Sequence, residues 1–447
     1  MVTSLVNRLV GLFADACAAL GAAVPLPEIE RLAMEVHRAM EGGRRIYHTT
    51  AHVLDMCRDA SPRQTLAALY HDVVYRQLDD GFPEPVDAML RRVVRRDGEA
   101  LRLRDIDPAD AELAMCAALF GLRPGDALPP YGGMNEFLSA VVAARRLAPH
   151  LRRADLLAVL AAIEATIPFR GPGPVETLAA RLAAASASFG ASLDAAAIDA
   201  IVRDAVIFAN RDVGNFAGAE PGRFLSATWM LIEESNAPLE RVGVYTLRDY
   251  RKALQRMEGF LAALDPDHVF HAYRGTPPAA EMARLAARAG ANLRFAVGYL
   301  GAKLAAIAVV EAIALETGGD APVSMFLGDI AAPEGRPDRV EDFLPVPPAR
   351  DDLDPQLLAV LEKGRSLESS NDLTASPLTA YLYRALGPAR LQDLVAQARR
   401  MFAGELAPTA FLAGQPRDPI DAVIEGCARI ALTRADALRA LRKRLAA

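Results

Sequence analysis

The stretch Leu66-Ala-Ala-Leu-Tyr-His-Asp-Val-Val-Tyr75 joins a long apolar run to an adjacent histidine and aspartate. Its apolar residues predict a buried helix over residues 63–78. A charged carboxylate at Asp72, between apolar neighbours, is costly to bury unless it is paired or bound to a metal. The stretch therefore predicts a core helix that carries a polar site, and an arginine partner for Asp72 is the structural alternative.

Apolar residues recur at helical spacing on both sides of this stretch. Ala, Leu and Arg dominate the chain, and segments that alternate as strands do are almost absent, with 323–327 as the best candidate. The sequence thus predicts an all-α protein. Helices are predicted over residues 3–20, 27–41, 49–59, 63–78, 85–96, 108–119, 134–147, 152–166, 175–188, 195–209, 221–233, 246–263, 277–290, 292–317, 354–364, 376–386, 389–403 and 417–445.

Clusters of proline and glycine mark breaks between the predicted helices. We place the main domain boundary at residues 265–276, which gives a domain over 1–265 and a C-terminal helical domain of unassigned role over 276–447. The alternative boundary lies at 319–353, where Pro-Val-Pro-Pro cannot continue a helix.

Composition excludes several classes of protein. The 447 residues are 52% hydrophobic and 24% charged, as in an ordinary globular protein. The formal net charge of −6 argues against a broad basic surface for extended nucleic acid, while a local basic pocket for a phosphate stays open. A single tryptophan and 6% aromatic residues disfavour stacking on bases.

The four cysteines are far apart in the sequence and form no Cys-x-x-Cys pair. This spacing disfavours a disulfide framework or a thiolate zinc site, and we expect a reducing, cytoplasmic location. The most membrane-like segment, residues 295–315, is interrupted by Lys303 and Glu311, so we expect a buried helix and no membrane partner.

Three histidines fall within 24 positions. His48 and His52 are four residues apart and share a helix face if that helix begins at Tyr47, and the pair His71-Asp72 follows. Imidazole nitrogens and a carboxylate oxygen are suitable ligands for Fe, Mn, Zn or Co. Each residue alone could have a purely structural role, since a histidine at a helix start is more often a cap or a surface residue.

The segments Arg45-Ile-Tyr-His-Thr-Thr-Ala-His and Leu69-Tyr-His-Asp-Val-Val-Tyr together resemble the predicted metal-dependent phosphohydrolases of the HD superfamily. The family pattern has Tyr-His-Asn-x-x-His, from which the chain departs at Thr49, and then Phe-His-Asp-x-Val-Tyr. The resemblance covers roughly residues 30–220 and implies an HD-domain-like helical bundle with an additional C-terminal helical region.

The resemblance also implies a set of metal ligands. His52 matches the first ligand, His71 and Asp72 match the adjacent pair, and His48 would be a nearby ligand or a substrate contact. Asn210-Arg-Asp-Val best matches the final aspartate element, which makes Asp212 the last ligand. From the residues alone, Asp212 could equally end a helix before Gly214.

Two further family elements are matched only in part. For Asn-Glu-x-x-Ser-Ala, the segment Pro83-Glu-Pro-Val-Asp-Ala keeps Glu84 and Ala88. For Ile-x-x-Thr-x-x-His, the segment beginning at Ile163 places Phe169 where the family has histidine, which weakens the case for a second metal ion.

A divalent ion at such a site, Mn, Fe, Co, Zn or Mg, would lower the pKa of a bound water and polarise a phosphoryl oxygen. Asp72 and Glu84 are the candidate proton acceptors, with His48 as a further catalytic candidate. The predicted activity is hydrolysis of a phosphate mono- or diester, with a small phosphorylated substrate such as a nucleotide.

Arginines next to the proposed ligands are candidates for binding the substrate phosphate. Arg45 lies just before His48, Arg170 follows Phe169, and Arg211 precedes Asp212. Arginine is suited to bidentate phosphate recognition. Arginines are abundant here, however, and most arginines in proteins are solvated.

Two other functions stay open from the sequence. An HD-type diiron oxygenase would need extra histidines as ligands for its second iron. A catalytically silent HD-like sensor or scaffold would need no phosphate hydrolysis at the site. His268 and His271 could form a lid or a second site, although their spacing at a domain junction is more often structural. Leucines at four-residue spacing in 376–386 could cover the active-site mouth or form a homodimer surface.

Overall fold

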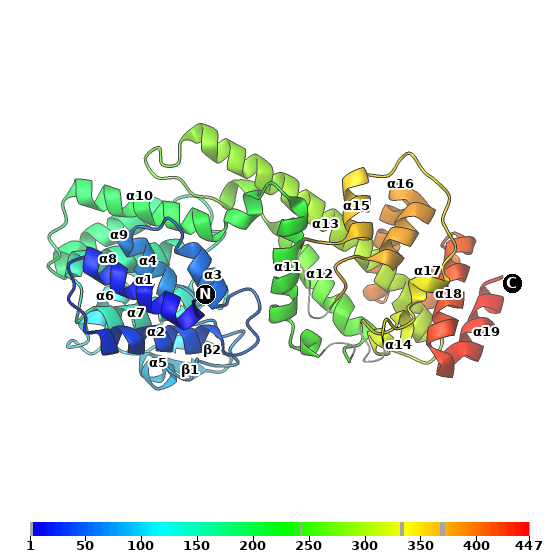
Figure 1. Cartoon of the computed structure of the whole chain (residues 1–447), viewed down its shortest axis with the longest axis horizontal. Helices are drawn as coiled ribbons and strands as arrows, with labels where there is room; N and C mark the ends of the chain where they lie inside the picture. Colours follow the sequence, from blue (N-terminus) through cyan, green and yellow to red (C-terminus); the bar gives the residue numbers. More distant parts are fainter. Residues whose placement is uncertain (1–2, 242–243, 331–334, 367–371, 447) are drawn as a thin grey trace. The chain divides into compact units, whose positions relative to one another are not determined.

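The computed structural model describes residues 3–241, 244–330, 335–366 and 372–446, and it is dominated by helices (Figure 1). The described residues form three short strands beside many helices, which confirms the all-α class. The chain divides into two compact units. Unit 1 comprises Met1–Ala217 and Leu264–Gly290, and unit 2 comprises Gly218–Ala263 and Ala291–Ala447.

The two units are interleaved along the chain, and this differs from the predicted domains. The segment 265–276, predicted as the boundary, lies inside unit 1. It is held there because the ring of Tyr273 belongs to the hydrophobic core of unit 1, and its hydroxyl donates a hydrogen bond to Asp199 Oδ1 at 3.0 Å. The chain crosses from unit 2 into unit 1 between Ala263 and Leu264, directly before this segment, and crosses back between Gly290 and Ala291.

Unit 1 is a bundle built around α8, in which every residue from Asp155 to Ala165 is buried. A helix that is apolar on all sides must be covered on all sides, and α8 packs against α4, α6, α7, α9 and α10. The helices of the bundle are α1 (Leu5–Ala19), α2 (Leu26–Met40), α3 (Thr50–Met56), α4 (Pro62–Tyr70), α5 (Asp87–Val93), α6 (Ala111–Phe120), α7 (Met134–Leu147), α8 (Arg153–Ala165), α9 (Pro174–Ser188) and α10 (Ala195–Asp212), followed by the 3-10 turns η1 (Gly214–Ala217) and η3 (Pro266–His268).

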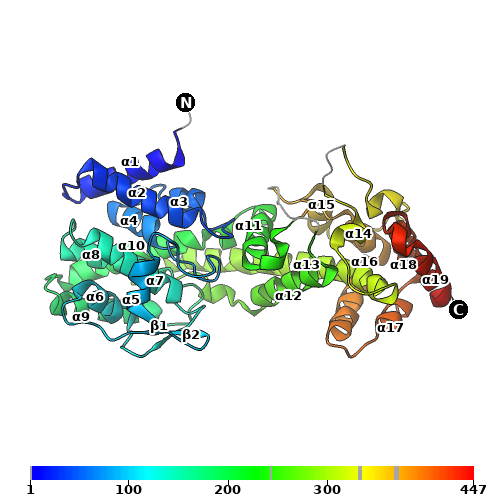
Figure 2. The same ribbon diagram turned by 90° about the horizontal axis from the view of Figure 1, so that it is seen from below.

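A small antiparallel sheet was not anticipated from the sequence. Strands β1 (Val94–Asp97) and β2 (Ala100–Leu103) pair as a hairpin, and β2 also pairs with β3 (Ala127–Leu128). The hairpin lies next to α5 (Figure 2). The last residues of the helix predicted over 85–96 belong to β1, and α5 ends at Val93. An Asp-Gly pair is a strong hairpin signal, and Gly98, with φ of +60°, supplies the left-handed residue of this turn.

Unit 2 is also helical. Its elements are α11 (Pro221–Ser235), η2 (Ala237–Glu240), α12 (Leu247–Ala263), the larger part of α13 (Ala279–Glu316), α14 (Val323–Leu327), η4 (Val340–Phe343), α15 (Pro355–Lys363), α16 (Pro377–Phe402), α17 (Pro408–Ala413), α18 (Arg417–Ile430), η5 (Leu432–Arg434) and α19 (Ala435–Ala446). The candidate strand 323–327 is helix α14, and that prediction was wrong.

Two other expectations concern unit 2. The leucines proposed as a dimer surface, Leu378, Leu382 and Leu386, are buried in α16, so they are not exposed for a second copy. Helix α13 is long and apolar enough to cross a membrane by length and composition, but 89% of its most apolar window is buried within the protein. Long core helices have the same composition.

Candidate metal centre

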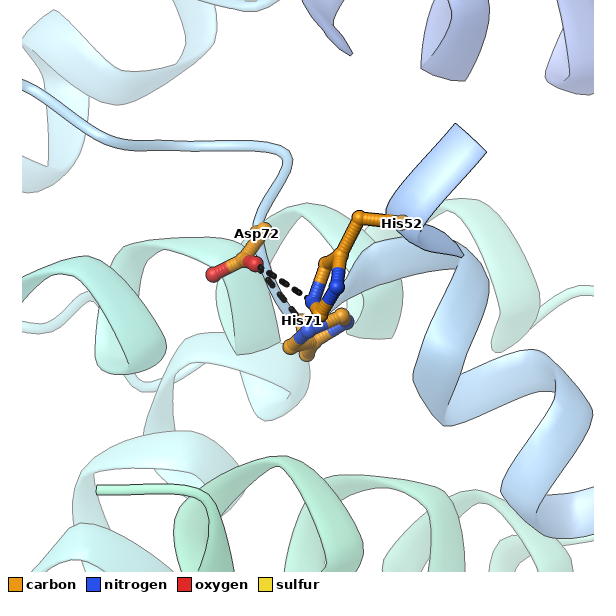
Figure 3. A group of neighbouring side chains, drawn as sticks. All are labelled: His52, His71 and Asp72. Carbon is orange, nitrogen blue, oxygen red and sulfur yellow. Dashed lines mark ion pairs between the residues drawn. The ribbon is translucent and has the colours of Figure 1, made fainter. Parts of the chain in front are cut away.

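Three of the predicted ligands meet at one point in unit 1 (Figure 3). His52 is on the first turn of α3, His71 caps the C-terminus of α4, and Asp72 follows it directly. One donor atom from each lies within 4.8 Å of the others. Asp72 Oδ2 is 3.0 Å from His71 Nε2 and 3.6 Å from His52 Nε2.

Asp212, the last residue of α10, joins the same group from the far end of the sequence. Its Oδ1 lies 3.3 Å from His52 Nε2 and 3.7 Å from His71 Nε2. The four predicted ligands therefore converge, two imidazoles and two carboxylates, from α3, α4 and α10.

The orientation of the imidazoles is suitable for a shared cation. Nδ1 of His71 lies 2.9 Å from the carbonyl oxygen of Ala68, and because a carbonyl only accepts, Nδ1 carries the proton. This contact orients the ring so that Nε2 faces the carboxylates, as second-shell contacts do in metal sites. Burial disfavours a second proton on the ring, but Asp72 and Asp212 outweigh burial and raise the pKa of His71, which favours a proton on Nε2 in the absence of a metal. Nε2 of His52 and of His71 are both buried, and neither has a hydrogen-bond partner among the described residues.

The two carboxylates are held in their ionised form. Burial disfavours the charge on Asp72, but the imidazoles of His71, His48 and His52 outweigh burial and lower the pKa of Asp72. Burial likewise opposes ionisation of Asp212, and His52 and His71 lower its pKa. A site with two anionic oxygens and two imidazole nitrogens is chemically matched to a divalent transition metal.

His48 lies beside this cluster, although not on the same helix as His52. Helix α3 begins at Thr50, one residue after the predicted start of the helix over 49–59, so a start at Tyr47, the condition for a shared helix face, is not met. The two imidazole rings are still 5.9 Å apart, and the ring of Tyr75 lies 4.8 Å from that of His48. The position is consistent with a substrate contact.

Glu84, predicted as a proton acceptor, is exposed, and it makes no ion pair or hydrogen bond with the described residues of the cluster. The pattern Asn-Glu-x-x-Ser-Ala occurs in full further along the chain, as Asn135-Glu-Phe-Leu-Ser-Ala140 at the start of α7. The two segments are separated along the chain by the β1–β2 hairpin and α6. The exact match at Asn135 was the available signal.

The side chains of this segment hold the chain that follows His71 and Asp72. Ser139 Oγ accepts a hydrogen bond from the backbone N–H of Val74 at 3.0 Å, and Asn135 Oδ1 accepts one from the N–H of Arg76 at 3.2 Å. Between them, Glu136 lies close to the cluster. Burial raises the pKa of Glu136 to about 7, and the negative charges of Asp72 and Asp212 contribute to this rise.

Two of the three predicted phosphate-binding arginines have structural roles instead. The side chain of Arg45 is fully buried in a bidentate ion pair with Asp79 and so cannot reach a substrate. Arg211 donates hydrogen bonds to the carbonyl oxygens of Met56 and Asp59, at 3.0 and 3.4 Å, which ties the end of α10 to the end of α3.

Arg170 is the predicted arginine that remains in a position to meet a substrate. It pairs with the buried Glu164 at 2.7 Å, and it lines an open hollow at the surface of unit 1. Phe169, which stands where the family pattern has histidine, packs edge-on against Phe216. Of the other histidines, His37 contacts Thr50 through Nδ1 at 3.1 Å, and His150 lies 3.6 Å from Glu28.

No family model, no curated protein and no solved structure matches this chain. Function is therefore inferred from the residues of the site alone.

Proposed function

We propose that unit 1 is a metal-dependent phosphohydrolase that acts on a small phosphate mono- or diester, with nucleotides among the candidate substrates. The observation that carries the proposal is the convergence of His52, His71, Asp72 and Asp212, with both Nε2 atoms free of hydrogen bonds among the described residues. Residues so far apart in sequence seldom bring four such ligands together for structural reasons alone.

A divalent ion bound by these four residues would activate a water and polarise a phosphoryl oxygen. Mn, Fe, Co or Zn is favoured over Mg, because imidazole ligands are preferred by transition metals. The protein would contribute three further functions: Glu136 accepts the proton of the attacking water, His48 contacts the substrate, and Arg170 neutralises negative charge on the substrate. Glu136 replaces Glu84 as the proposed proton acceptor because its neighbours Asn135 and Ser139 accept hydrogen bonds from the chain that follows Asp72, whereas Glu84 is exposed.

Two other functions are outcomes of the same test. A diiron oxygenase would need more histidines, and the position that would supply one holds Phe169. A silent sensor would keep the ligands and show no turnover.

The test is elemental analysis of the purified full chain after loading with Mn²⁺ and desalting, followed by assays on a panel of phosphate esters. We expect about one ion per chain, held by three or more ligands from the protein. The variant Asp72→Ala should lose this ion. Glu84→Ala, which alters an exposed carboxylate, is the matched control and should keep the ion.

Stoichiometric metal in Asp72→Ala would contradict the assignment. About two irons per chain with oxygen uptake would favour the oxygenase. Bound metal without turnover on any ester would favour the sensor.

A further inference from the structure

The turn between α8 and α9 forms an open hollow of about 390 Å³. Helix α8 ends at Ala165, the chain turns through Phe169 in a left-handed conformation (φ of +55°), and α9 begins at Pro174. Arg170 and Arg181 both line the hollow, together with Thr177 and residues 171–174. Its volume is in the range of small-molecule sites.

The two arginines share one carboxylate. Glu164 is buried and accepts hydrogen bonds from Arg170 Nη1 at 2.7 Å and Nη2 at 3.2 Å. Arg181 Nη1 is 3.8 Å from Glu164, which is too long for a hydrogen bond. Nε of Arg170 is buried without a partner among the described residues. The guanidinium groups thus keep donors that Glu164 does not satisfy.

The arginine side chains are also held in place before any ligand arrives. The guanidinium of Arg181 lies against the backbone of Gly121, where a Cβ atom would collide with it. Gly121 has φ of +69° and ends α6. Arginine held in one rotamer loses less conformational entropy on binding.

The segment that returns to unit 1 is anchored at the end of α10. The side-chain amide of Asn210 donates to the carbonyl oxygen of His271 and accepts from its N–H, both at 2.8 Å, which fixes His271 beside the end of α10. Nε2 of His271 is buried and has no partner among the described residues. Burial and the positive charge of Arg170 lower the pKa of His271.

The turn that carries Arg170 packs against the segment that follows Asp212, because the ring of Phe169 contacts the ring of Phe216 edge-on, with the ring centroids 5.4 Å apart. The charges of Arg170, Asp72 and Asp212 all act on the carboxyl of Glu136. Arg170 thus lines the hollow and also lowers the pKa of the proposed proton acceptor.

We propose that Arg181 and Arg170 bind a second anionic group of the substrate, one that is not the group attacked at the metal. This inference rests on the proposed function. It narrows the substrate class to small phosphorylated molecules that carry at least two oxyanion groups, either a second phosphate or a carboxylate.

The test is calorimetric titration of the full chain, stripped of metal by EDTA and dialysis, with tripolyphosphate and separately with tricarballylate. Without metal, binding reports on the hollow alone. Arg181→Gln should weaken binding by about tenfold or more, the cost of charge-assisted hydrogen bonds to an anion. Arg170 is not used, since its loss would leave Glu164 buried and unpaired.

Two further variants sharpen the result. Glu176→Gln removes an exposed negative charge on the first turn of α9 and should tighten binding by a few-fold. Arg91→Gln, in α5, removes an exposed arginine elsewhere in unit 1 and should change nothing. Binding of tripolyphosphate alone indicates a second phosphate, and binding of tricarballylate alone indicates a carboxylate.

Absence of binding by the wild-type chain, or equal binding by Arg181→Gln, would overturn the inference. Metal content is measured separately, so a failure of the metal site is distinguished from a failure of the hollow. In the metal-loaded chain, Arg181→Gln should lower kcat/KM only for esters with a second anionic group, and an equal loss for singly charged esters would count against a second-group site.

Discussion

The guanidinium of Arg45 donates a hydrogen bond of 2.6 Å from Nη1 to the main-chain carbonyl of Asp72. Through Nη2 it reaches the next carbonyl, that of Val73, at 3.3 Å, while its ion pair with Asp79 fixes the guanidinium itself. A residue expected to bind phosphate therefore fixes the backbone of a proposed metal ligand.

Replacement of Arg45 by Met should destabilise unit 1 by about 3–5 kcal/mol, because Asp79 would be left buried without its partner. The backbone of Asp72 would also lose its anchor, so metal content should fall. Urea unfolding followed by circular dichroism, together with elemental analysis, measures both effects. Arg44→Met is the control: Arg44 pairs with the exposed Asp80, and such pairs contribute about 1 kcal/mol or less. Equal effects of the two substitutions would show that Arg45 has no special role.

Glu136→Gln should separate catalysis from metal binding. The substitution preserves shape but removes the proton acceptor, and general-base catalysis contributes about 10²- to 10⁴-fold. We expect kcat to fall in that range while metal content stays unchanged. Glu84→Gln, measured in the same assay, should retain full activity. A large loss in Glu84→Gln with none in Glu136→Gln would restore the first assignment.

The sequence was informative about those features of the structure that depend on residues close together along the chain. Apolar spacing predicted the helices because one face of each must be buried, and the His-Asp pair marked α4 as the carrier of a site. Asp212 was reached only through the resemblance, since an aspartate at a helix end is common. The position of His52 relative to Asp212 depends on how α3 and α10 pack, and no local pattern encodes that packing.

The wrong assignments concern long-range partners. Arg45 was taken as a phosphate ligand because its ion-pair partner, Asp79, lies 34 positions away and is one acid among many. Glu84 was chosen over Glu136, which we now propose as the proton acceptor, because Glu84 follows the His-Asp pair directly while the β1–β2 hairpin and α6 lie between that pair and Glu136. The segment 323–327 has the composition of a strand, but the described residues of unit 2 contain no strand with which it could pair. Its backbone N–H and C=O groups therefore form hydrogen bonds within a helix.

Metal binding should stabilise the protein by mass action. An ion that binds only the folded form adds about 2.7 kcal/mol at a concentration of 100 times its Kd. Thermal unfolding with increasing Mn²⁺ should therefore show a rising Tm in the wild-type chain. Asp212→Asn, which keeps the shape but removes the charge of the fourth ligand, should show a much smaller rise. An unchanged response in this variant would remove Asp212 from the ligand set.

Unit 2 contains a buried charge network around Trp229, the single tryptophan of the chain. Lys303 Nζ lies 4.7 Å from the centre of that ring, and the guanidinium carbon of Arg365 lies 4.1 Å from it. Lys303 also pairs with Asp372 at 2.7 Å and donates to Ser376 at 3.2 Å. Two cations thus lie against the indole ring.

Lys303→Met should destabilise unit 2 by about 3 kcal/mol, since loss of one partner of a buried ion pair leaves the other poorly compensated. Tryptophan fluorescence during urea unfolding measures this directly, because Trp229 reports on unit 2 alone. The native emission should also change, since one of the two cations next to the indole is removed. Lys252→Met, at an exposed position of α12, is the matched control and should leave both the unfolding midpoint and the emission unchanged. If the unfolding midpoint of Lys303→Met equals that of the control, the ion pair between Lys303 and Asp372 contributes no more to stability than a surface pair does.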